Sequence, residues 1–268
     1  MSAQPPVVEL KKVDKQFGRG GVVALDGIDL EVAAGEFISL IGPSGCGKST
    51  LLRIVGDLTE PTGGEVVVNG KTARRARIDR DYGIVFQDAV LYDWRTVAKN
   101  IALPLEMLGW ERKRRAERVD EMLRLVELSG FEGHHPWQLS GGMQQRVAIA
   151  RALSFDPALL LMDEPFGALD EMTRERLNME LLRIWEQAGS TILFVTHSIA
   201  EAVFLSTRVV VMSPRPGRVA SVVPIDLPRP RTVETREDPR FFEAVTQVRE
   251  LLRAGGADAA VEAEEVEV

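Results

Sequence analysis

The sequence predicts an α/β protein built around a mainly parallel sheet, and two observations lead to this fold class. Short runs of β-branched and other apolar residues recur, several of them apolar at consecutive positions, which is typical of strands buried on both faces of a sheet. Segments with apolar residues at helical spacing lie between the later runs. We expect seven such strands, at residues 7–10, 37–41, 65–69, 83–86, 159–162, 191–195 and 209–212.

Residues 96–155 differ from the rest because they contain no convincing strand. Three segments there, at 96–108, 115–128 and 141–153, place apolar residues at helical spacing. We interpret the region as a helical subdomain inserted into the α/β core. Pro104 should kink or break the first of these helices, since proline lacks the N–H that a helix requires.

The C-terminal part of the chain falls into three stretches. Residues 213–231 are rich in Pro and Arg and predict a turn, an edge strand and an extended exit, for which a solvated linker is favoured over a site for an anionic partner. A final helix is expected at 240–253. We divide the chain into a main domain at 1–232, a helical extension at 233–256 and a mobile acidic tail at 257–268.

The composition narrows the functional classes. The 268 residues carry a net charge of −7, mostly from the acidic tail, so the chain lacks the basic face that general nucleic-acid binding needs. The basic run at 111–118 is interleaved with acids and predicts a charged helix face.

Cys46 alone cannot form an internal disulfide and fits a reducing compartment. The N-terminus lacks a signal-peptide pattern and no apolar run reaches the ~20 residues of a membrane span, so membrane contact would require a partner.

The stretch GPSGCGKST, at residues 42–50, carries the strongest chemical signal. It follows a predicted strand, precedes a predicted helix and matches the phosphate-binding loop pattern in full. Its glycines let successive N–H groups face phosphates, Lys48 supplies a positive charge, and the Ser49 hydroxyl suits Mg²⁺. Cys46 occupies a variable position without a role of its own. The predicted nucleotide-binding residues of this stretch are Gly42, Pro43, Ser44, Gly45, Cys46, Gly47, Lys48, Ser49 and Thr50.

Two further strand ends carry candidate catalytic groups. Asp163 and Glu164 follow the strand at 159–162, where Asp163 is predicted to hold Mg²⁺ and Glu164 to act as general base toward water. His197 follows the strand at 191–195 and should reach the γ-phosphate. Taken alone, the acidic pair could be a helix N-cap and the histidine a structural residue.

Gln87 follows the strand at 83–86 and leads into the helical region. Its amide can ligate Mg²⁺ or a water molecule and can move with the joint between two subdomains. An exposed glutamine without function is the alternative.

The stretch LSGGMQQR, at residues 139–146, predicts a second device for binding an anion. Ser140 suits the N-cap of a helix, and Gly141 and Gly142 permit close approach to its free N–H groups. The phosphate loop of the same chain would already surround most of a bound triphosphate. The anion expected at the start of this helix is therefore the γ-phosphate of a nucleotide held by another copy of the chain.

These motifs, together with GALD at residues 167–170, occur in an order that resembles the nucleotide-binding subunit of an ABC transporter, from about residue 7 to 225. The resemblance implies a P-loop NTPase of ABC type, with a RecA-like mixed sheet core, an antiparallel β subdomain and an inserted helical subdomain. It also implies a head-to-tail homodimer with two ATP molecules sandwiched between the subunits. Asp170 would lie in the loop that crosses between the two sites. Phe17 would stack on adenine, with a core position as its alternative.

Within that family, residues 163–185 and 212–231 resemble the ATPases of importers for nitrate, alkanesulfonates and taurine. Residues 89–101 look like the contact region for the membrane subunit, although Asp93 stands where proline is common. The resemblance implies a permease, a separate extracytoplasmic solute-binding protein, and a peripheral location at the cytoplasmic face of the inner membrane.

Two other functions are alternatives to the importer. A soluble ABC-type ATPase in a non-transport assembly, such as iron–sulfur cluster biogenesis, would use the same dimer, but Cys46 alone offers no cluster site. A module that senses ATP without turnover would not need Glu164 and His197.

Overall fold

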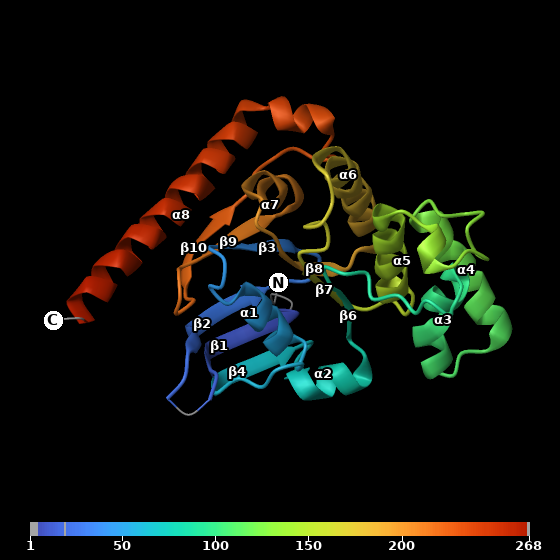
Figure 1. Ribbon diagram of the computed structural model, residues 1–268, viewed down its shortest axis with the longest axis horizontal. Helices are drawn as coiled ribbons and strands as arrows, with labels where there is room; N and C mark the ends of the chain where they lie inside the picture. The colour runs from blue at the N-terminus through green and yellow to red at the C-terminus, as the bar shows by residue number, and fades with distance from the viewer. Residues whose placement is uncertain (1–4, 19, 267–268) are drawn as a thin grey trace.

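A computed structural model describes residues 5–18 and 20–266 (Figure 1). Its main sheet has six strands in the order β10-β9-β3-β8-β7-β6, all parallel except the antiparallel edge strand β10. The strands are β3 Phe37–Ile41, β6 Tyr82–Val85, β7 Leu159–Asp163, β8 Thr191–Val195, β9 Arg208–Met212 and β10 Val219–Pro224. The predicted mainly parallel sheet and its edge strand are therefore confirmed.

A second sheet is antiparallel throughout, in the order β2-β1-β4-β5. Its strands are β1 Val8–Gln16, β2 Val23–Val32, β4 Gly63–Val68 and β5 Lys71–Thr72, and the short helix α2 Ala73–Asp79 follows. The sequence analysis did not predict β2. Its apolar residues alternate with polar ones, and Gly27 interrupts the run at a positive φ of 60°, which conceals a strand in a search for continuous apolar runs.

The main sheet is covered on both faces, and alternate residues of each strand point to opposite layers. On one face, side chains such as Phe37, Leu160 and Phe194 pack with four helices. These are α5 Gly141–Leu153, α6 Glu171–Ala188, α7 Ile199–Leu205 and α8 Pro239–Val266. On the other face, Leu40, Leu161 and their neighbours pack with α1 Lys48–Val55 and the antiparallel sheet. Because both faces are buried, these strands are apolar at most positions.

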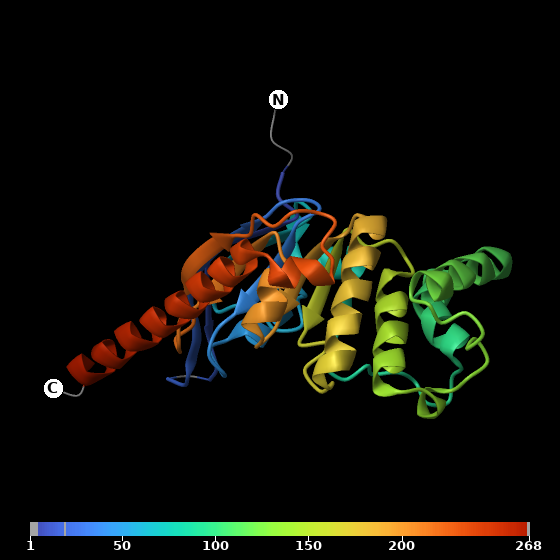
Figure 2. The ribbon, with the colours of Figure 1, turned by 90° about the horizontal axis from the view of Figure 1, so that it is seen from above.

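Between β6 and β7 the secondary structure is helical, as the periodicity predicted. The elements are α3 Val97–Met107, α4 Arg112–Leu125, the 3₁₀ turn η1 Pro136–Gln138 and α5 Gly141–Leu153, and they lie together at one end of the molecule (Figures 1 and 2). Pro104 does not break α3, so the predicted break was wrong. It lies in the last turn, where helical bonding continues from Leu108 N–H to the Pro104 carbonyl at 3.0 Å.

The C-terminal helix is longer than predicted. After the 3₁₀ turn η2 Val233–Glu237, α8 runs from Pro239 to Val266 instead of ending near residue 253, and it extends away from the body (Figure 2). Residues 257–266, expected to form a mobile tail, are thus helical. Alanine and glutamate dominate there, and both have high helix propensity.

The Pro- and Arg-rich segment at 213–231 was predicted to be a solvated linker, but its last residue, Arg231, is buried. This side chain is 4% exposed, and its guanidinium donates hydrogen bonds to the carbonyl oxygens of Val203, Phe204 and Ser206, at the end of α7. Burial lowers the pKa of Arg231 to about 10. The segment therefore fastens α8 to the core, and Arg231 is not available to an anionic partner.

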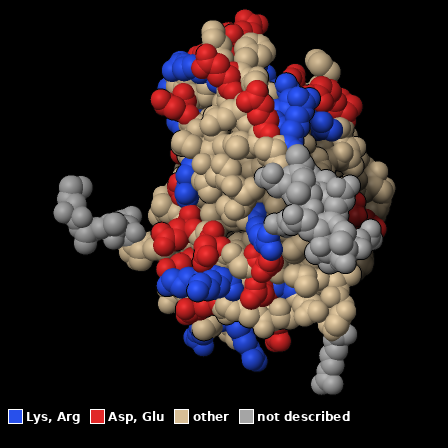
Figure 3. Space-filling view, turned by 90° about the vertical axis from the view of Figure 1, so that its left-hand side faces the viewer, with Lys and Arg blue, Asp and Glu red and all other residues tan. Residues whose placement is uncertain are grey.

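Among residues 5–18 and 20–266, no helix is both long and apolar enough to cross a membrane. On the face drawn in Figure 3, described basic and acidic side chains are interspersed and neither sign forms a continuous field.

Candidate functional site

Three parallel strands bring the predicted groups to one edge of the main sheet. In the register of the sheet, Leu40 of β3 and Asp163 of β7 both pair with Val195 of β8, so these strands end at the same level. The phosphate loop follows β3, Glu164 follows β7 and His197 follows β8. The edge at which these groups meet is the one where parallel α/β sheets bind their ligands.

The phosphate loop links β3 to α1, and its glycines are required by its geometry. Gly47 adopts a φ of 107°, and a Cβ atom there would lie 2.9 Å from the Ala24 carbonyl oxygen. At Gly42 a Cβ atom would lie 2.8 Å from Cys46 Sγ. Side chains at these positions would force the loop open, so glycine lets it turn tightly into the first turn of α1, where backbone N–H groups are free.

Lys48, the first residue of α1, is 4% exposed and folded against the loop. Its Nζ donates to the carbonyl oxygens of Gly42 at 2.8 Å and Pro43 at 3.0 Å. The third contact, Cys46 Sγ at 3.8 Å, is with a weak acceptor. A phosphate oxygen is a far stronger acceptor, so one ammonium donor can turn toward a nucleotide while the other two keep the loop folded.

Ser49 and Asp163 are joined directly. The Ser49 hydroxyl donates a hydrogen bond of 2.7 Å to Asp163 Oδ1, and the Asp163 residue is 8% exposed. The pair connects the first turn of α1 to the end of β7. Hydroxyl and carboxylate oxygens together are the hard donors that Mg²⁺ prefers, so the residues present fit this ion.

Glu164 and His197 also meet. His197 Nε2 lies 2.6 Å from Glu164 Oε1. Glu164 adopts a positive φ of 49°, which is uncommon outside glycine, and its N–H donates to the Val195 carbonyl oxygen at 3.0 Å. The sheet edge thus holds an unfavoured backbone conformation that directs the Glu164 carboxylate toward the histidine.

Two cavities adjoin this pair. One, of about 520 Å³, is lined by the phosphate loop, Glu164, His197 and the half-exposed Phe17. The other, of about 270 Å³, is lined by Gln87 together with Glu164 and His197. Glu164 and His197 line both cavities, so they form the boundary between them. A larger cavity of about 600 Å³, between α4 and the end of α6, contains none of the predicted site residues.

Arg215 lines the cavity of about 520 Å³, next to the phosphate loop, and was not among the predicted site residues. It lies between β9 and β10, and its guanidinium donates to the Gly45 carbonyl oxygen from Nη2 at 3.0 Å and from Nε at 3.2 Å. The arginine belongs to the Pro- and Arg-rich segment that we interpreted as a linker. Its proximity to the phosphate loop depends on the pairing of β9 with β3, which composition does not reveal.

Ser140, Gly141 and Gly142 begin α5 as predicted but line neither of the two cavities, as far as the described residues show. Ser140 Oγ accepts the Met143 N–H at 3.3 Å. Gly142 lies against Thr173 of α6. The signature stretch therefore contacts the neighbourhood of Asp170 in its own subunit and leaves the N–H groups of the first turn of α5 without helical partners.

Asp170 is the N-cap of α6. Its carboxylate accepts the Thr173 N–H at 3.0 Å, and this hydrogen bond is the main cause that lowers the pKa of Asp170. In this position the side chain ends the loop that starts at Glu164. Among the described residues, Asp170 lines neither the cavity next to the phosphate loop nor the cavity next to Gln87.

The fold and this sheet edge define an ATPase of the ATP-binding cassette class. A model of the family described as ABC transporter matches residues 25–167, and the chain belongs to that family. An uncharacterized ABC transporter ATP-binding protein of Methanocaldococcus jannaschii is 50% identical over 238 residues, 89% of this chain and 87% of the relative. The aliphatic sulfonates import ATP-binding protein SsuB of Bacillus cereus is 43% identical over 251 residues, 93% of this chain and 97% of the relative.

A solved structure extends the similarity. The ATP-binding cassette MJ0796, in a dimeric post-hydrolysis state bound to ADP and Pi, aligns with a TM-score of 0.70 and 38% identity, over 81% of this chain and 98% of that chain. These comparisons confirm the predicted ABC-type fold and the predicted ATPase activity. ATP is accordingly the nucleotide that this cassette binds.

Proposed function

We propose that this chain is the ATP-hydrolysing subunit of an ABC importer, which powers the uptake of a small solute such as nitrate, an alkanesulfonate or taurine. The observation that carries this proposal is the similarity to an aliphatic sulfonates import protein, which includes 97% of that relative's length. In this function the chain works at the cytoplasmic face of the inner membrane with a separate permease, and a solute-binding protein delivers the solute to that permease.

In the proposed site, each group has one task. Lys48 and the N–H groups of the phosphate loop hold the phosphates of ATP, and Phe17 stacks on the adenine. Ser49 and Asp163, with the amide of Gln87, would hold Mg²⁺, which when bound neutralises charge on the phosphates. Glu164 accepts a proton from the attacking water, and His197 keeps the carboxylate oriented.

The second half of the site comes from another copy of the chain in this proposal. Ser140 to Gly142 do not reach the nucleotide cavity of their own subunit, yet their helix start presents free N–H groups. A head-to-tail dimer places them on the γ-phosphate of the partner's ATP, and Asp170 lies in the loop that crosses between the sites. The dimeric state of the related cassette supports this arrangement.

An exposed aromatic surface supports the permease contact. Tyr92, Trp94 and Trp137 are 40%, 74% and 64% exposed. The His135 ring stacks on Trp137 with centroids 4.4 Å apart, and its Nδ1 lies 3.1 Å from the Asp93 carbonyl oxygen. Clustered exposed aromatic residues are typical of protein interfaces. Tyr92 and Trp94 lie on the segment that leads into the helical region, and Trp137 lies within that region, so a movement of the helical region on dimer closure would be passed to a bound permease.

The experiment that tests the proposal is purification of the tagged chain from gently solubilised membranes of its own cells, followed by mass spectrometry. Recovery of a permease with several membrane-spanning segments supports an importer, and a solute-binding protein can then be screened for its ligand by thermal shift. Trp94→Ala should lower permease recovery at least fivefold, whereas Phe242→Ala, which removes an exposed aromatic side chain from α8, should not. Recovery with soluble partners only would favour a non-transport ATPase.

A further inference from the structure

The buried carboxyl group of Glu201 lies close to Glu164 and His197 but has no role in the site described so far. Glu201, in the first turn of α7, is 5% exposed and lines the same cavity of about 270 Å³ as Glu164 and His197. Burial raises the pKa of Glu201. The neighbouring Asn178 side chain lowers that pKa in part, but Oε1 makes no hydrogen bond within ordinary geometric limits. Burying a carboxyl group that is only partly bonded costs free energy, so a purely apolar residue would serve packing better.

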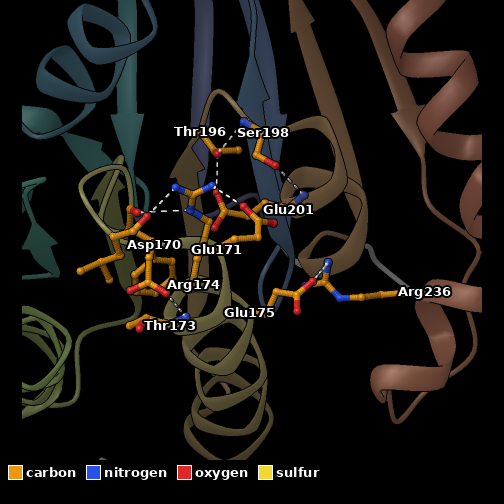
Figure 4. A network of polar contacts seen from close by, with 11 residues as sticks. Asp170, Glu171, Thr173, Arg174, Glu175, Thr196, Ser198, Glu201 and Arg236 are labelled. Atoms are coloured by element: carbon orange, nitrogen blue, oxygen red, sulfur yellow. Dashed lines mark hydrogen bonds and ion pairs between the residues drawn. The ribbon is translucent and has the colours of Figure 1, made fainter.

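The bonded oxygen of Glu201 organises the loop that carries His197. The Thr196 hydroxyl donates to Glu201 Oε2, and Thr196 Oγ1 in turn accepts the Ser198 N–H at 3.0 Å. Ser198 Oγ accepts the Glu201 N–H at 3.3 Å, which closes a ring of three hydrogen bonds. Figure 4 shows Thr196, Ser198 and Glu201 in this ring. His197 lies between Thr196 and Ser198 in the chain, so the ring holds the backbone on both sides of it.

Arg174 lines the same cavity and holds the other loop. Its Nη2 donates to the Leu169 carbonyl oxygen at 2.7 Å, and its Nε donates to the Phe166 carbonyl oxygen at 3.4 Å. Both acceptors belong to the stretch between Glu164 and Asp170. The Arg174 charge also favours the ionised form of Glu201, against the larger effect of burial. The two loops that carry Glu164 and His197 are therefore held by two residues that line one cavity.

We propose that Glu201 is a positioning residue of the ATPase site, which acts through Thr196 to hold His197 Nε2 against the Glu164 carboxylate. The inference rests on the proposed function, because it takes Glu164 and His197 as members of that site. Small displacements of a catalytic group lower the rate of the chemical step much more than they weaken substrate binding. Loss of the Glu201 acceptor should therefore reduce kcat and leave KM for ATP nearly unchanged.

A purely structural role predicts a different outcome. An acidic residue in the first turn also stabilises a helix by interacting with its dipole. In that case removal of Glu201 would lower the melting temperature, while the folded molecules would hydrolyse ATP at the parent rate with His197 in its parent environment.

The first measurement is steady-state ATP hydrolysis by the purified full chain. Glu201→Gln keeps a carbonyl oxygen that can accept the Thr196 hydroxyl, so its kcat should stay within about twofold of the parent. Glu201→Ala and Thr196→Val each remove one end of that hydrogen bond and should lower kcat about tenfold or more, with KM for ATP changed less than about threefold. The double variant should be no slower than the slower single variant, because both changes break the same bond. Glu175→Gln is the matched control, since this carboxylate on α6 pairs with Arg236 at 3.3 Å.

The second measurement observes His197 directly. The chain has three histidines, so the ring signals are few enough to assign by NMR with His197→Ala as reference. The His197 signal should move in Glu201→Ala and Thr196→Val and stay in place in Glu201→Gln and Glu175→Gln. The signals of His134 and His135, which lie in the helical region, should not move in any of them.

Parent kcat in Glu201→Ala, or an unmoved His197 signal in a slower Glu201→Ala protein, would overturn the positioning role. Equal losses in Glu201→Gln and Glu201→Ala would also overturn it, because they would show a need for charge rather than for an acceptor. These outcomes leave the proposed function standing if Glu164→Gln is inactive. If Glu164→Gln and His197→Ala both hydrolyse ATP at the parent rate, the assignment of the site fails first.

Discussion

His197 Nε2 lies 2.6 Å from Glu164 Oε1, and the two side chains come from loops that follow adjacent parallel strands. The contact fixes the carboxylate at the boundary of two cavities, one of which is also lined by the phosphate loop. A carboxylate held in this way can accept a proton from water without having to reorient first. In the proposed site this arrangement links nucleotide binding to the rate of hydrolysis, and the link is open to a direct test.

Glu164→Gln should bind ATP and hydrolyse it at least a hundredfold more slowly, because an amide fills the same space but cannot act as a base. Size-exclusion chromatography with ATP should show the variant as a stable dimer. Lys48→Ala is the contrasting variant: it removes the charge at the loop and should weaken nucleotide binding, so no ATP-dependent dimer should form. Hydrolysis by Glu164→Gln at the parent rate would show that Glu164 is not the base.

The position of the catalytic edge could be predicted from the sequence, whereas its supporting contacts could not. GPSGCGKST, Asp163 and His197 each follow an apolar run, and parallel strands necessarily end on one side of a sheet. Glu201 and Arg215 gave no such signal, since their contacts with Thr196 and Gly45 depend on how α7 and the β9–β10 connection pack. Their roles appear only when the tertiary structure is known.

The C-terminal region shows the same limit in a different way. Pro- and Arg-rich composition correctly predicted an edge strand at β10, but it suggested a solvated exit where Arg231 is buried. A charged side chain can be buried when backbone carbonyls at a helix end accept its hydrogen bonds, and local composition does not reveal such acceptors. Helix α8 continues beyond residue 253, where the sequence predicted its end. The acidic composition of the last residues is typical of a flexible tail, but their alanine and glutamate residues also have high helix propensity.

Phe17→Ala should weaken ATP binding about tenfold, because stacking of an aromatic ring on a base contributes about 1–3 kcal/mol. Phe17 lines the nucleotide cavity and is 49% exposed, so its truncation should not disturb the core. Phe17→Tyr keeps the ring and should bind ATP as the parent does. Titration with a fluorescent ATP analogue gives the affinities, with Phe242→Ala as control. Equal affinity of Phe17→Ala and the parent would assign the ring to another role.

Tyr82 should make stability fall in a defined alkaline range. Its hydroxyl donates to the Gly56 carbonyl oxygen, and burial raises its pKa to about 12, from an ordinary value of 10.0. Above pH 10 the unfolded chain loses this proton while the folded chain keeps it, so the folded state binds more protons and the free energy of unfolding falls as pH rises toward 12. The full contribution is about 2–3 kcal/mol.

The measurement is urea unfolding of the parent and of Tyr82→Phe between pH 8 and about pH 11.5, where the phenylalanine has no proton to lose. The stability advantage of the parent should shrink as pH rises above 10. Tyr92→Phe is the matched control, because the chain has two tyrosines and Tyr92 is 40% exposed. A parent and a Tyr82→Phe protein that lose stability in parallel across this range would contradict the assignment.

Arg231→Met should lower the free energy of unfolding by about 3 kcal/mol, since it leaves the buried carbonyl oxygens of Val203, Phe204 and Ser206 without their donor. Arg229→Met is the matched control two residues away, where an exposed guanidinium lies 4.2 Å from the centroid of the Trp185 ring and a loss of about 0.5–1 kcal/mol is expected. Urea unfolding measures both losses, and ATP hydrolysis per folded molecule should be unchanged in each. If Arg231→Met unfolds at the parent's urea midpoint, the segment behaves as the solvated linker that its composition suggested, and α8 must be held by its apolar contacts alone.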